Sequence, residues 1–379
     1  MPVEPFQIHV DDAVLDDLAA RLRHTRWPDA APGEPWSQGT DLAYLRDIVA
    51  YWADGFDWRA RERELNRFHH FRTVVDGVSL HFVHERGRGR GGGVPLILTH
   101  GWPSTFLEML ALVPMLVERG FDVVVPSLPG YGFSERPART GVTTRYVAGL
   151  WHRLMRELGY ERYGAHGSDF GSAVTTYMAL DDPSPLVGIH LSNLDVAPYT
   201  GPGSRPLSEE ERAYVAHNTG WWRAEGGYKE VQATKPQSLG YALTDSPAGL
   251  AGWILEKWRS WSNSDGDVDG RFGRDFLLTT LTLYWVTGSI TTSMRDYYDN
   301  RWSASPLGPD DIVRVPTAVA AFDNNFSDEG AAPREWAERL YNVVRWTRMP
   351  RGGHFAAAEE PKLVADDLTA FFTTVNTPP

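Results

Sequence analysis

The chain has 379 residues and a net charge of −12, from 37 basic and 49 acidic side chains. This acidic balance disfavours nucleic acids and anionic membrane surfaces as partners. Hydrophobic residues make up 42% of the chain and charged residues 23%, which suits a globular protein with a substantial core. Because cysteine is absent, disulfides, thiol nucleophiles and cysteine-bound zinc are excluded.

The start of the chain does not read as a secretory signal, because acidic residues interrupt it at Glu4, Asp11, Asp12, Asp16 and Asp17. No stretch reaches the roughly 18 apolar residues that a membrane-spanning helix needs. We therefore expect a cytoplasmic protein with no membrane partner.

Residues 1–93 form the first of four predicted parts, an N-terminal segment that is helical to about residue 70. The amphipathic run 14–22 predicts one helix, and a second is expected from about Leu42 through Trp58. Asp76-Gly77 then joins two short runs rich in β-branched residues. This turn dipeptide predicts a β-hairpin.

Strands alternate with helices in residues 94–194, which is typical of a parallel sheet. The strands are expected at 94–98, 121–126 and 161–165. Residues 195–305 break the alternation and are helix-prone and rich in Trp and Tyr, as a cap over the sheet would be. The sheet pattern resumes in residues 306–379 with a strand at about 315–322 and a final helix at about 361–372.

The segment 166–172, His-Gly-Ser-Asp-Phe-Gly-Ser, follows a predicted strand and precedes a predicted helix. A strand, a Gly-x-nucleophile-x-Gly turn and a helix form a nucleophile elbow. The centre of this turn is Asp169, whereas Ser168 is off-centre because His and Phe stand where its glycines would be needed. A carboxylate nucleophile attacks carbon, which indicates opening of an epoxide or displacement of a leaving group. For the pentapeptide alone, an ordinary surface turn is the alternative.

Two further segments stand where this architecture needs them. The loop His100-Gly101-Trp102-Pro103 follows a buried strand, and the backbone N–H groups of Trp102 and Phe170 are the expected oxyanion donors. Losing one such donor typically costs about 3 kcal/mol. His354 follows two glycines ahead of the final helix and is the expected general base. These motifs predict an α/β-hydrolase with a mostly parallel sheet, a helical cap and an N-terminal helical segment that wraps around it.

With these motifs the chain resembles the microsomal-type epoxide hydrolases, in a bacterial form with their N-terminal segment. The resemblance runs from Pro5-Phe6 to the final helix and includes Thr234-Lys235-Pro236-Gln237, Asp245-Ser246-Pro247 and the Gly-Gly-His-Phe-Ala-Ala block. It implies an epoxide substrate, water, a vicinal diol product and no cofactor. No metal is expected, because no second ligand accompanies His100 at metal-ligand spacing. A homodimer is a further expectation.

The resemblance also implies two tyrosines, Tyr228 and Tyr297, as acids that protonate the epoxide oxygen. A phenol suits this role because it stays protonated at neutral pH. Without the resemblance, both would be interpreted as packing residues. Trp102, Phe170 and Tyr241 are expected to contact the substrate.

The chain departs from the family pattern at two positions. Phe170 stands where the family usually has tryptophan, which alters the pocket wall but leaves the backbone donor. Asn325 stands where the family has the acid that orients the catalytic histidine. Glu329 in the following short insertion is our preferred replacement, with Asp328 and Asp195 as alternatives.

Two other functions remain open from the sequence. A haloalkane dehalogenase shares the aspartate nucleophile and the histidine but needs halide-binding N–H groups in place of the two phenols. A non-catalytic ligand-binding protein on the same fold is favoured only by Asn325. Release of a diol from a general epoxide would separate the three.

Overall fold

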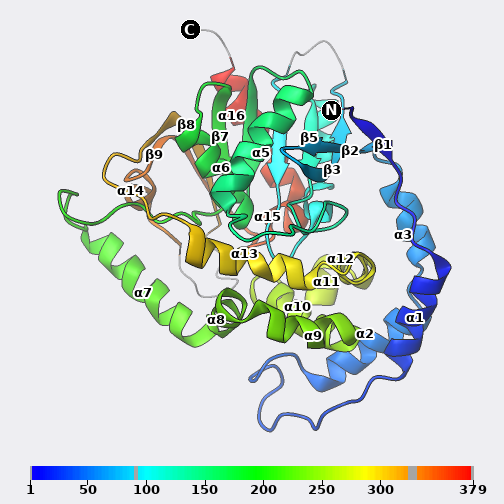
Figure 1. The fold of residues 1–379 in the computed structure, drawn as a ribbon. Coiled ribbons are helices and arrows are strands. Elements are labelled where there is room, and N and C mark those ends of the chain that lie inside the picture. The colour runs from blue at the N-terminus through cyan, green and yellow to red at the C-terminus, as the bar shows by residue number, and fades with distance from the viewer. Residues whose placement is uncertain (1, 89–92, 323–330, 377–379) are drawn as a thin grey trace.

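The computed structural model describes residues 2–88, 93–322 and 331–376. A single mixed sheet forms its centre, in the order β1-β2-β3-β5-β4-β6-β7-β8-β9 (Figure 1). Neighbours from β5 to β9 are parallel, whereas β1, β2 and β3 form an antiparallel edge. The strands are β1 (Glu4–Phe6), β2 (His70–Val75), β3 (Val78–Glu85), β4 (Leu96–Thr99), β5 (Val123–Pro126), β6 (Tyr163–Gly167), β7 (Leu186–Leu191), β8 (Val313–Phe322) and β9 (Tyr341–Met349).

Helices cover both faces of this sheet, and strand β4 shows how the core is divided between them. Leu96 and Leu98 pack in the cluster that α4 and α16 share, whereas Ile97 packs with α5 and α6. Alternate side chains of a strand point to opposite faces, so a strand with helices on both sides is apolar throughout. These helices are α4 (Val113–Glu118), α5 (Thr144–Glu157), α6 (Phe170–Asp181) and α16 (Pro361–Val375).

The helical region between β7 and β8 lies to one side of the sheet, beyond the strands (Figure 1). It is the cap that the Trp- and Tyr-rich composition predicted. Its helices are α7 (Glu209–Glu225), α8 (Gly227–Thr234), α9 (Pro236–Asp245), α10 (Pro247–Ser260), α11 (Val268–Phe272), α12 (Arg274–Thr287) and α13 (Ile290–Ser303). Shorter elements near the site are η1 (Phe106–Met109), α14 (Arg334–Ala337) and α15 (Ala356–Glu359).

The N-terminal segment joins the cap to the sheet. Strand β1 pairs with β2 at the sheet edge, while α1 (Asp12–Arg23) and α2 (Leu42–Asp54) pack against α10 and α12 of the cap (Figure 1). The buried Trp52 indole donates to Thr282 Oγ1 at 2.9 Å, and Thr40 Oγ1 donates to the Gly252 carbonyl at 2.6 Å. The N-terminal segment therefore contacts both the sheet and the cap, as expected of a segment that wraps around the fold.

Local details differ from the sequence-based expectations. The helix expected from Leu42 through Trp58 is two helices, because α2 ends at Asp54 and α3 (Trp58–Leu65) begins anew. Gly55 closes the first helix, and the Asp57 side chain accepts from the Ala60 N–H to start the second. Strand β1 was not expected at all, because three residues are too few to show a periodic pattern.

The predicted hairpin is present as β2 and β3. Asp76 and Gly77 at its turn have φ angles of 53° and 79°, which matches the left-handed pair that Asp-Gly favours.

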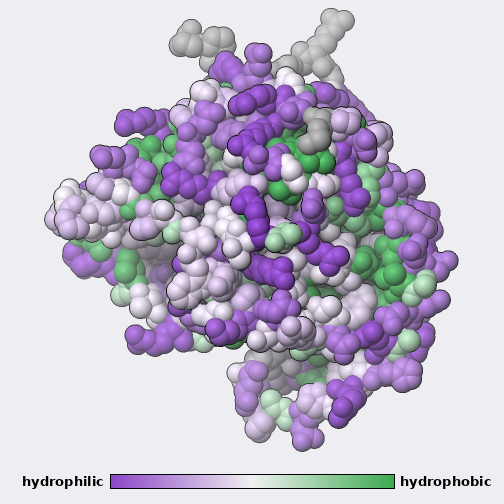
Figure 2. Space-filling view, in the orientation of Figure 1, coloured by the Kyte–Doolittle hydropathy of each residue, from purple (hydrophilic) through white to green (hydrophobic). Residues whose placement is uncertain are grey.

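The face of the molecule shown in Figure 2 is mostly hydrophilic, with apolar residues in small separate areas. Among the described residues, no helix combines the length and the apolar character needed to cross a membrane.

Candidate active site

The predicted elbow lies between β6 and α6, and its backbone is strained at the centre. Asp169 has a φ of 55° and a ψ of −129°, a conformation that L-residues rarely adopt. A Cβ on Gly167 would lie 2.0 Å from the Gly171 carbonyl oxygen, and one on Gly171 would lie 2.0 Å from that of Thr99. The glycine on either side of Asp169 is thus required by close backbone approach.

Two backbone N–H groups hold one oxygen of the Asp169 carboxylate. The N–H of Trp102 donates to Oδ1 at 2.8 Å, and the N–H of Phe170 donates to the same oxygen at 2.7 Å. A Cβ on Gly101 would fall 2.2 Å from this oxygen, so the loop approaches only because residue 101 is glycine. The arrangement has the geometry of an oxyanion hole.

Asn193, which follows β7, holds the elbow in place through hydrogen bonds. Its role was not recognised from the sequence. Its Oδ1 accepts the Asp169 N–H at 2.7 Å and the Ser172 hydroxyl at 2.9 Å. The Ser172 hydroxyl also lies 3.0 Å from the Gly167 carbonyl. These bonds satisfy polar groups that the sharp turn would otherwise leave without partners.

His354 faces the other oxygen of Asp169. Its Nε2 lies 3.2 Å from Asp169 Oδ2, and its side chain is 12% exposed. The backbone N–H of His354 donates to the Trp261 carbonyl of the cap at 2.9 Å, and the Trp261 ring packs edge-on against the imidazole. The position of His354 is therefore set both by Trp261 of the cap and by Asp169 of the elbow.

Glu359, also missed from the sequence, anchors the loop that carries His354. Its Oε1 accepts the Phe355 N–H at 3.1 Å, and its Oε2 accepts the Asn263 N–H at 2.8 Å. Arg271 Nε donates to the same Oε2 at 3.3 Å. Burial raises the pKa of Glu359, against the stabilising hydrogen bonds from Asn263 and Arg271. One buried carboxyl thus links the histidine loop to two segments of the cap.

Glu359→Ala is expected to destabilise the fold by about 3 kcal/mol, because it leaves two backbone N–H groups without their acceptor and removes one of the two carboxylate partners of Arg271. Glu359→Gln, which keeps the shape and one acceptor, should lose less. Urea unfolding of both variants measures the difference. Equal losses for Ala and Gln would show that the charge, and not the pair of backbone bonds, determines the stability of the loop.

Burial shifts the pKa values of two further groups near the site, His100 and Glu108. Burial lowers the pKa of His100 to about 4, and its two ring nitrogens contact the Gly101 carbonyl and the Leu128 N–H. His100 is thus a neutral side chain whose contacts hold in place the loop of residues 100–103, called the oxyanion loop because it carries the Trp102 N–H. Burial raises the pKa of Glu108 on η1 to about 7, with a hydrogen bond from Ser104 acting in the opposite direction.

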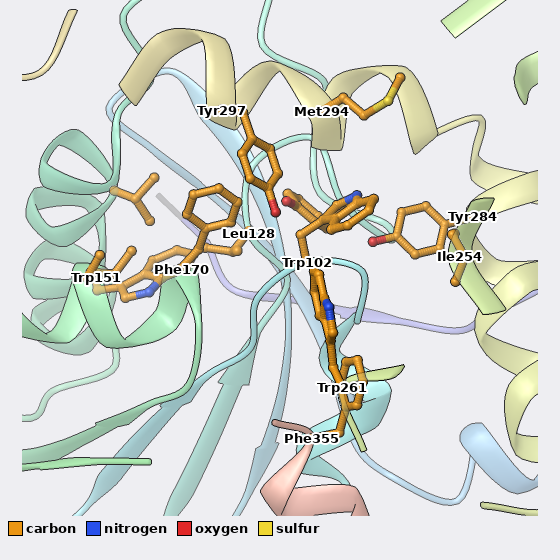
Figure 3. Packing of buried hydrophobic residues seen from close by; sticks show 14 of the residues in the cluster. Trp102, Leu128, Trp151, Phe170, Ile254, Trp261, Tyr284, Met294, Tyr297 and Phe355 are labelled. Carbon is orange, nitrogen blue, oxygen red and sulfur yellow. The ribbon is translucent and has the colours of Figure 1, made fainter. Parts of the chain in front are cut away.

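The two predicted tyrosines lie together on cap helices. The rings of Tyr228 on α8 and Tyr297 on α13 are 5.9 Å apart and nearly perpendicular. Figure 3 shows Tyr297 reaching from its helix toward Phe170 and Trp102, and the Phe170 and Tyr297 rings are 4.8 Å apart. Burial, reinforced by the nearby Tyr228 and Asp169, raises the pKa of Tyr297 well above its usual value. It therefore stays a protonated donor.

A cavity of about 710 Å³ joins these groups. Its size lies within the range of small-molecule sites. Asp169, His354, Tyr228 and Tyr297 all line it, which brings the predicted nucleophile, base and acids to one space. The other aromatic residues of its wall are Phe170, Tyr177, Tyr199, Trp221, Trp222 and Trp261.

Several predicted residues take other positions. Tyr241 is 70% exposed and is not among the residues lining the cavity, so its expected substrate contact has no support. The Trp102 side chain is fully buried and stacks against Tyr228, so its contribution to the cavity is indirect. Asp195 is exposed and lines the cavity.

The other candidates for the orienting acid, Glu329 and Asp328, lie outside the described residues, as does Asn325. The assignment of Glu329 therefore stays a prediction. Among the residues that are described, no group of three or more His, Asp or Glu side chains is arranged to hold a metal ion.

An aspartate at a strand–turn–helix elbow, a histidine on a later loop and a helical cap define an α/β hydrolase. Residues 94–361 match the family described as alpha/beta hydrolase fold, and residues 3–109 match the family described as Epoxide hydrolase N terminus. "Epoxide hydrolase 1" of Sus scrofa is 35% identical to this chain, over 97% of the chain and 88% of the relative.

Solved structures of epoxide hydrolases are also similar to this chain. The juvenile hormone epoxide hydrolase of the silkworm Bombyx mori has a TM-score of 0.89 and 31% identity, covering 99% of this chain and 96% of its own. The Aspergillus niger epoxide hydrolase has a TM-score of 0.86 and 28% identity, covering 99% and 97%. The chain belongs to the epoxide hydrolase family, as its motifs predicted, and is a hydrolase that acts on ether bonds.

Proposed function

We propose that this enzyme converts an epoxide to a vicinal diol through a covalent ester on Asp169. In the first step Oδ2 of Asp169 forms a bond to an epoxide carbon, and the carbon–oxygen bond of the ring breaks. The released oxygen takes a proton from Tyr228 or Tyr297. The substrate is then held as an alkyl ester whose carbonyl oxygen is Oδ1.

In the second step His354 takes a proton from water, and the hydroxide attacks Cγ of Asp169. Negative charge develops on Oδ1, where the N–H groups of Trp102 and Phe170 stabilise it. The bond between Cγ and Oδ2 breaks, and the leaving oxygen takes the proton from His354. The proton left on the Asp169 carboxyl restores the tyrosine. Each step uses protein groups, the epoxide and water.

The observation that carries this proposal is the unequal placement of the two Asp169 oxygens. Oδ1 accepts both oxyanion N–H groups, whereas Oδ2 lies 3.2 Å from His354 Nε2. A carboxylate held in this way presents one oxygen for attack and keeps the other in the oxyanion hole for the ester stage. The two buried phenols on the same cavity favour an epoxide over an alkyl halide, whose leaving group needs no proton.

A single turnover in ¹⁸O-water tests the covalent route. Because Oδ2 of Asp169 passes into the product, the first diol released should carry ordinary oxygen, and the label should enter Asp169. Mass spectrometry of the diol and of the peptide that contains Asp169 measures both. A labelled first diol together with an unlabelled peptide would mean direct attack by water on the epoxide.

A further inference from the structure

A buried lysine of the cap directs its ammonium group at one of the two proposed acids. Lys257 on α10 is only 7% exposed. Its Nζ lies over the Tyr228 ring, 4.8 Å from the ring centroid, and 5.7 Å from the centroid of Trp261. Lysine is almost never buried without a partner, so this position calls for an explanation.

Part of the explanation is an ion pair with the adjacent Glu256, whose side chain is 21% exposed. This pair gives the ammonium group a carboxylate partner but does not account for its direction toward the Tyr228 and Trp261 rings. The Tyr228 ring has Trp102 stacked nearly parallel to it at 5.5 Å. The ionisable groups that line the cavity with Tyr228 are Asp169, Tyr177, Asp195, Tyr199, Lys229, Glu230, Tyr297, Arg301 and His354.

The chemistry of ring opening gives the cation a function. When Tyr228 passes its proton to the epoxide oxygen, negative charge develops on the phenol and its ring. An ammonium group over an aromatic face attracts the electron-rich ring, and it attracts the tyrosinate more strongly than the neutral phenol. Such a contact strengthens toward the transition state, and only contacts of that kind accelerate a chemical step.

We infer that Lys257 is a positioning residue that acts through Tyr228, holding its ring beside the oxyanion loop and stabilising the negative charge that the phenol acquires as the epoxide opens. The inference rests on the proposed function, because it requires Tyr228 to be an acid. Lys257 itself is not among the residues that line the cavity.

The test separates the two tyrosines. In a Tyr297→Phe background Tyr228 is the remaining proposed donor, and Lys257→Met should slow pre-steady-state alkylation of Asp169 by about 10- to 30-fold, the range of a desolvated cation–π contact. Lys257→Arg should restore most of that rate. In a Tyr228→Phe background Lys257→Met should have no effect, because the group through which it acts is gone. Hydrolysis of the ester should be unchanged throughout.

The pH profile distinguishes this role from a packing role. In the Tyr297→Phe background Tyr228 donates only while it is protonated, so alkylation falls as pH rises. Because the cation favours the tyrosinate, its removal by Lys257→Met should move the falling limb to higher pH. Lys362→Met is the matched control, since it removes an exposed ion-paired lysine with a side chain that is 76% exposed. Lys362→Met should leave the alkylation rate and the falling limb of its pH profile unchanged.

The outcomes separate the role of Tyr228 from the role of Lys257. Tyr228→Phe with parental alkylation would remove Tyr228 from the proposed mechanism. A slow Tyr228→Phe beside an unaffected Lys257→Met would keep the acid and overturn the inference about Lys257. An equal effect of Lys257→Met in both backgrounds would also overturn it. If Lys257→Met fails to fold, Glu256→Gln/Lys257→Met removes the whole ion pair and supports the same comparison.

Discussion

His354→Gln is expected to accumulate enzyme that carries one substrate mass on Asp169. Attack by Asp169 Oδ2 on the epoxide does not use the histidine, whereas activation of water does. Loss of general-base assistance should slow hydrolysis of the ester by about 10²–10⁴-fold, so the covalent form becomes the dominant species. Intact-protein mass spectrometry after incubation with a small epoxide measures it, and digestion should locate the added mass on the peptide that contains Asp169.

The matched control for this variant is His69→Gln. The side chain of His69 is 73% exposed and pairs with Glu85, far along the chain from the loop that carries His354. This change should leave turnover and the mass spectrum as in the parent. If His354→Gln were inactive and unmodified although it folded normally, the histidine would be needed for attack on the epoxide, and the two-step scheme would be wrong.

The proposed nucleophile and base could be located from the sequence because the geometry around them is encoded locally. Gly167, Asp169 and Gly171 lie within one turn, and each glycine is required by a backbone approach that any side chain would block. His354 stands after two glycines, at the end of β9, where the chain order of the fold places the base. Oxyanion donors Trp102 and Phe170 follow from the same rules, because backbone N–H groups do not depend on side-chain identity.

The groups that support the pair could not be predicted, because their partners are distant in sequence. Glu359 meets Asn263 and Arg271 only after the cap has folded against the sheet, across 96 and 88 residues. Asn193 meets Asp169 across 24 residues, at the ends of neighbouring strands. Neither residue belongs to a short motif with a mechanism attached, although Glu359 lies five residues after the proposed base, His354.

Lys257 and Tyr241 are two cap residues whose burial could not be predicted from the sequence. Each stands in a helical stretch of the cap, and the sequence alone does not say which face of its helix meets the cavity. Lysine is usually exposed and tyrosine is usually half-buried. Residue type therefore predicts an exposed Lys257 and a more buried Tyr241, the opposite of what the structure shows. Here Lys257 is buried against Tyr228, whereas Tyr241 is 70% exposed.

Tyr228→Phe/Tyr297→Phe is expected to lose about 10²–10⁴-fold in the rate of Asp169 alkylation, because no acid remains for the epoxide oxygen. Each single variant keeps one donor and should lose less, with weaker binding because the hydrogen bond to the oxygen already exists in the ground state. Burial holds the pKa of Tyr297 well above its usual value, so this acid stays protonated through neutral pH and is lost only as pH rises through that higher pKa. Stopped-flow measurement of alkylation over a range of alkaline pH follows both effects.

Tyr241→Phe is the matched control, because it removes an exposed cap hydroxyl that does not line the cavity and should leave alkylation unchanged. An alkyl halide supplies a second comparison, since a halide leaves without a proton and the double variant should not slow any attack on it. The double variant removes only two hydroxyl groups, so its thermal unfolding should stay close to that of the parent. A folded double variant that opens epoxides at the parental rate would take both tyrosines out of the mechanism and return the haloalkane reaction to consideration.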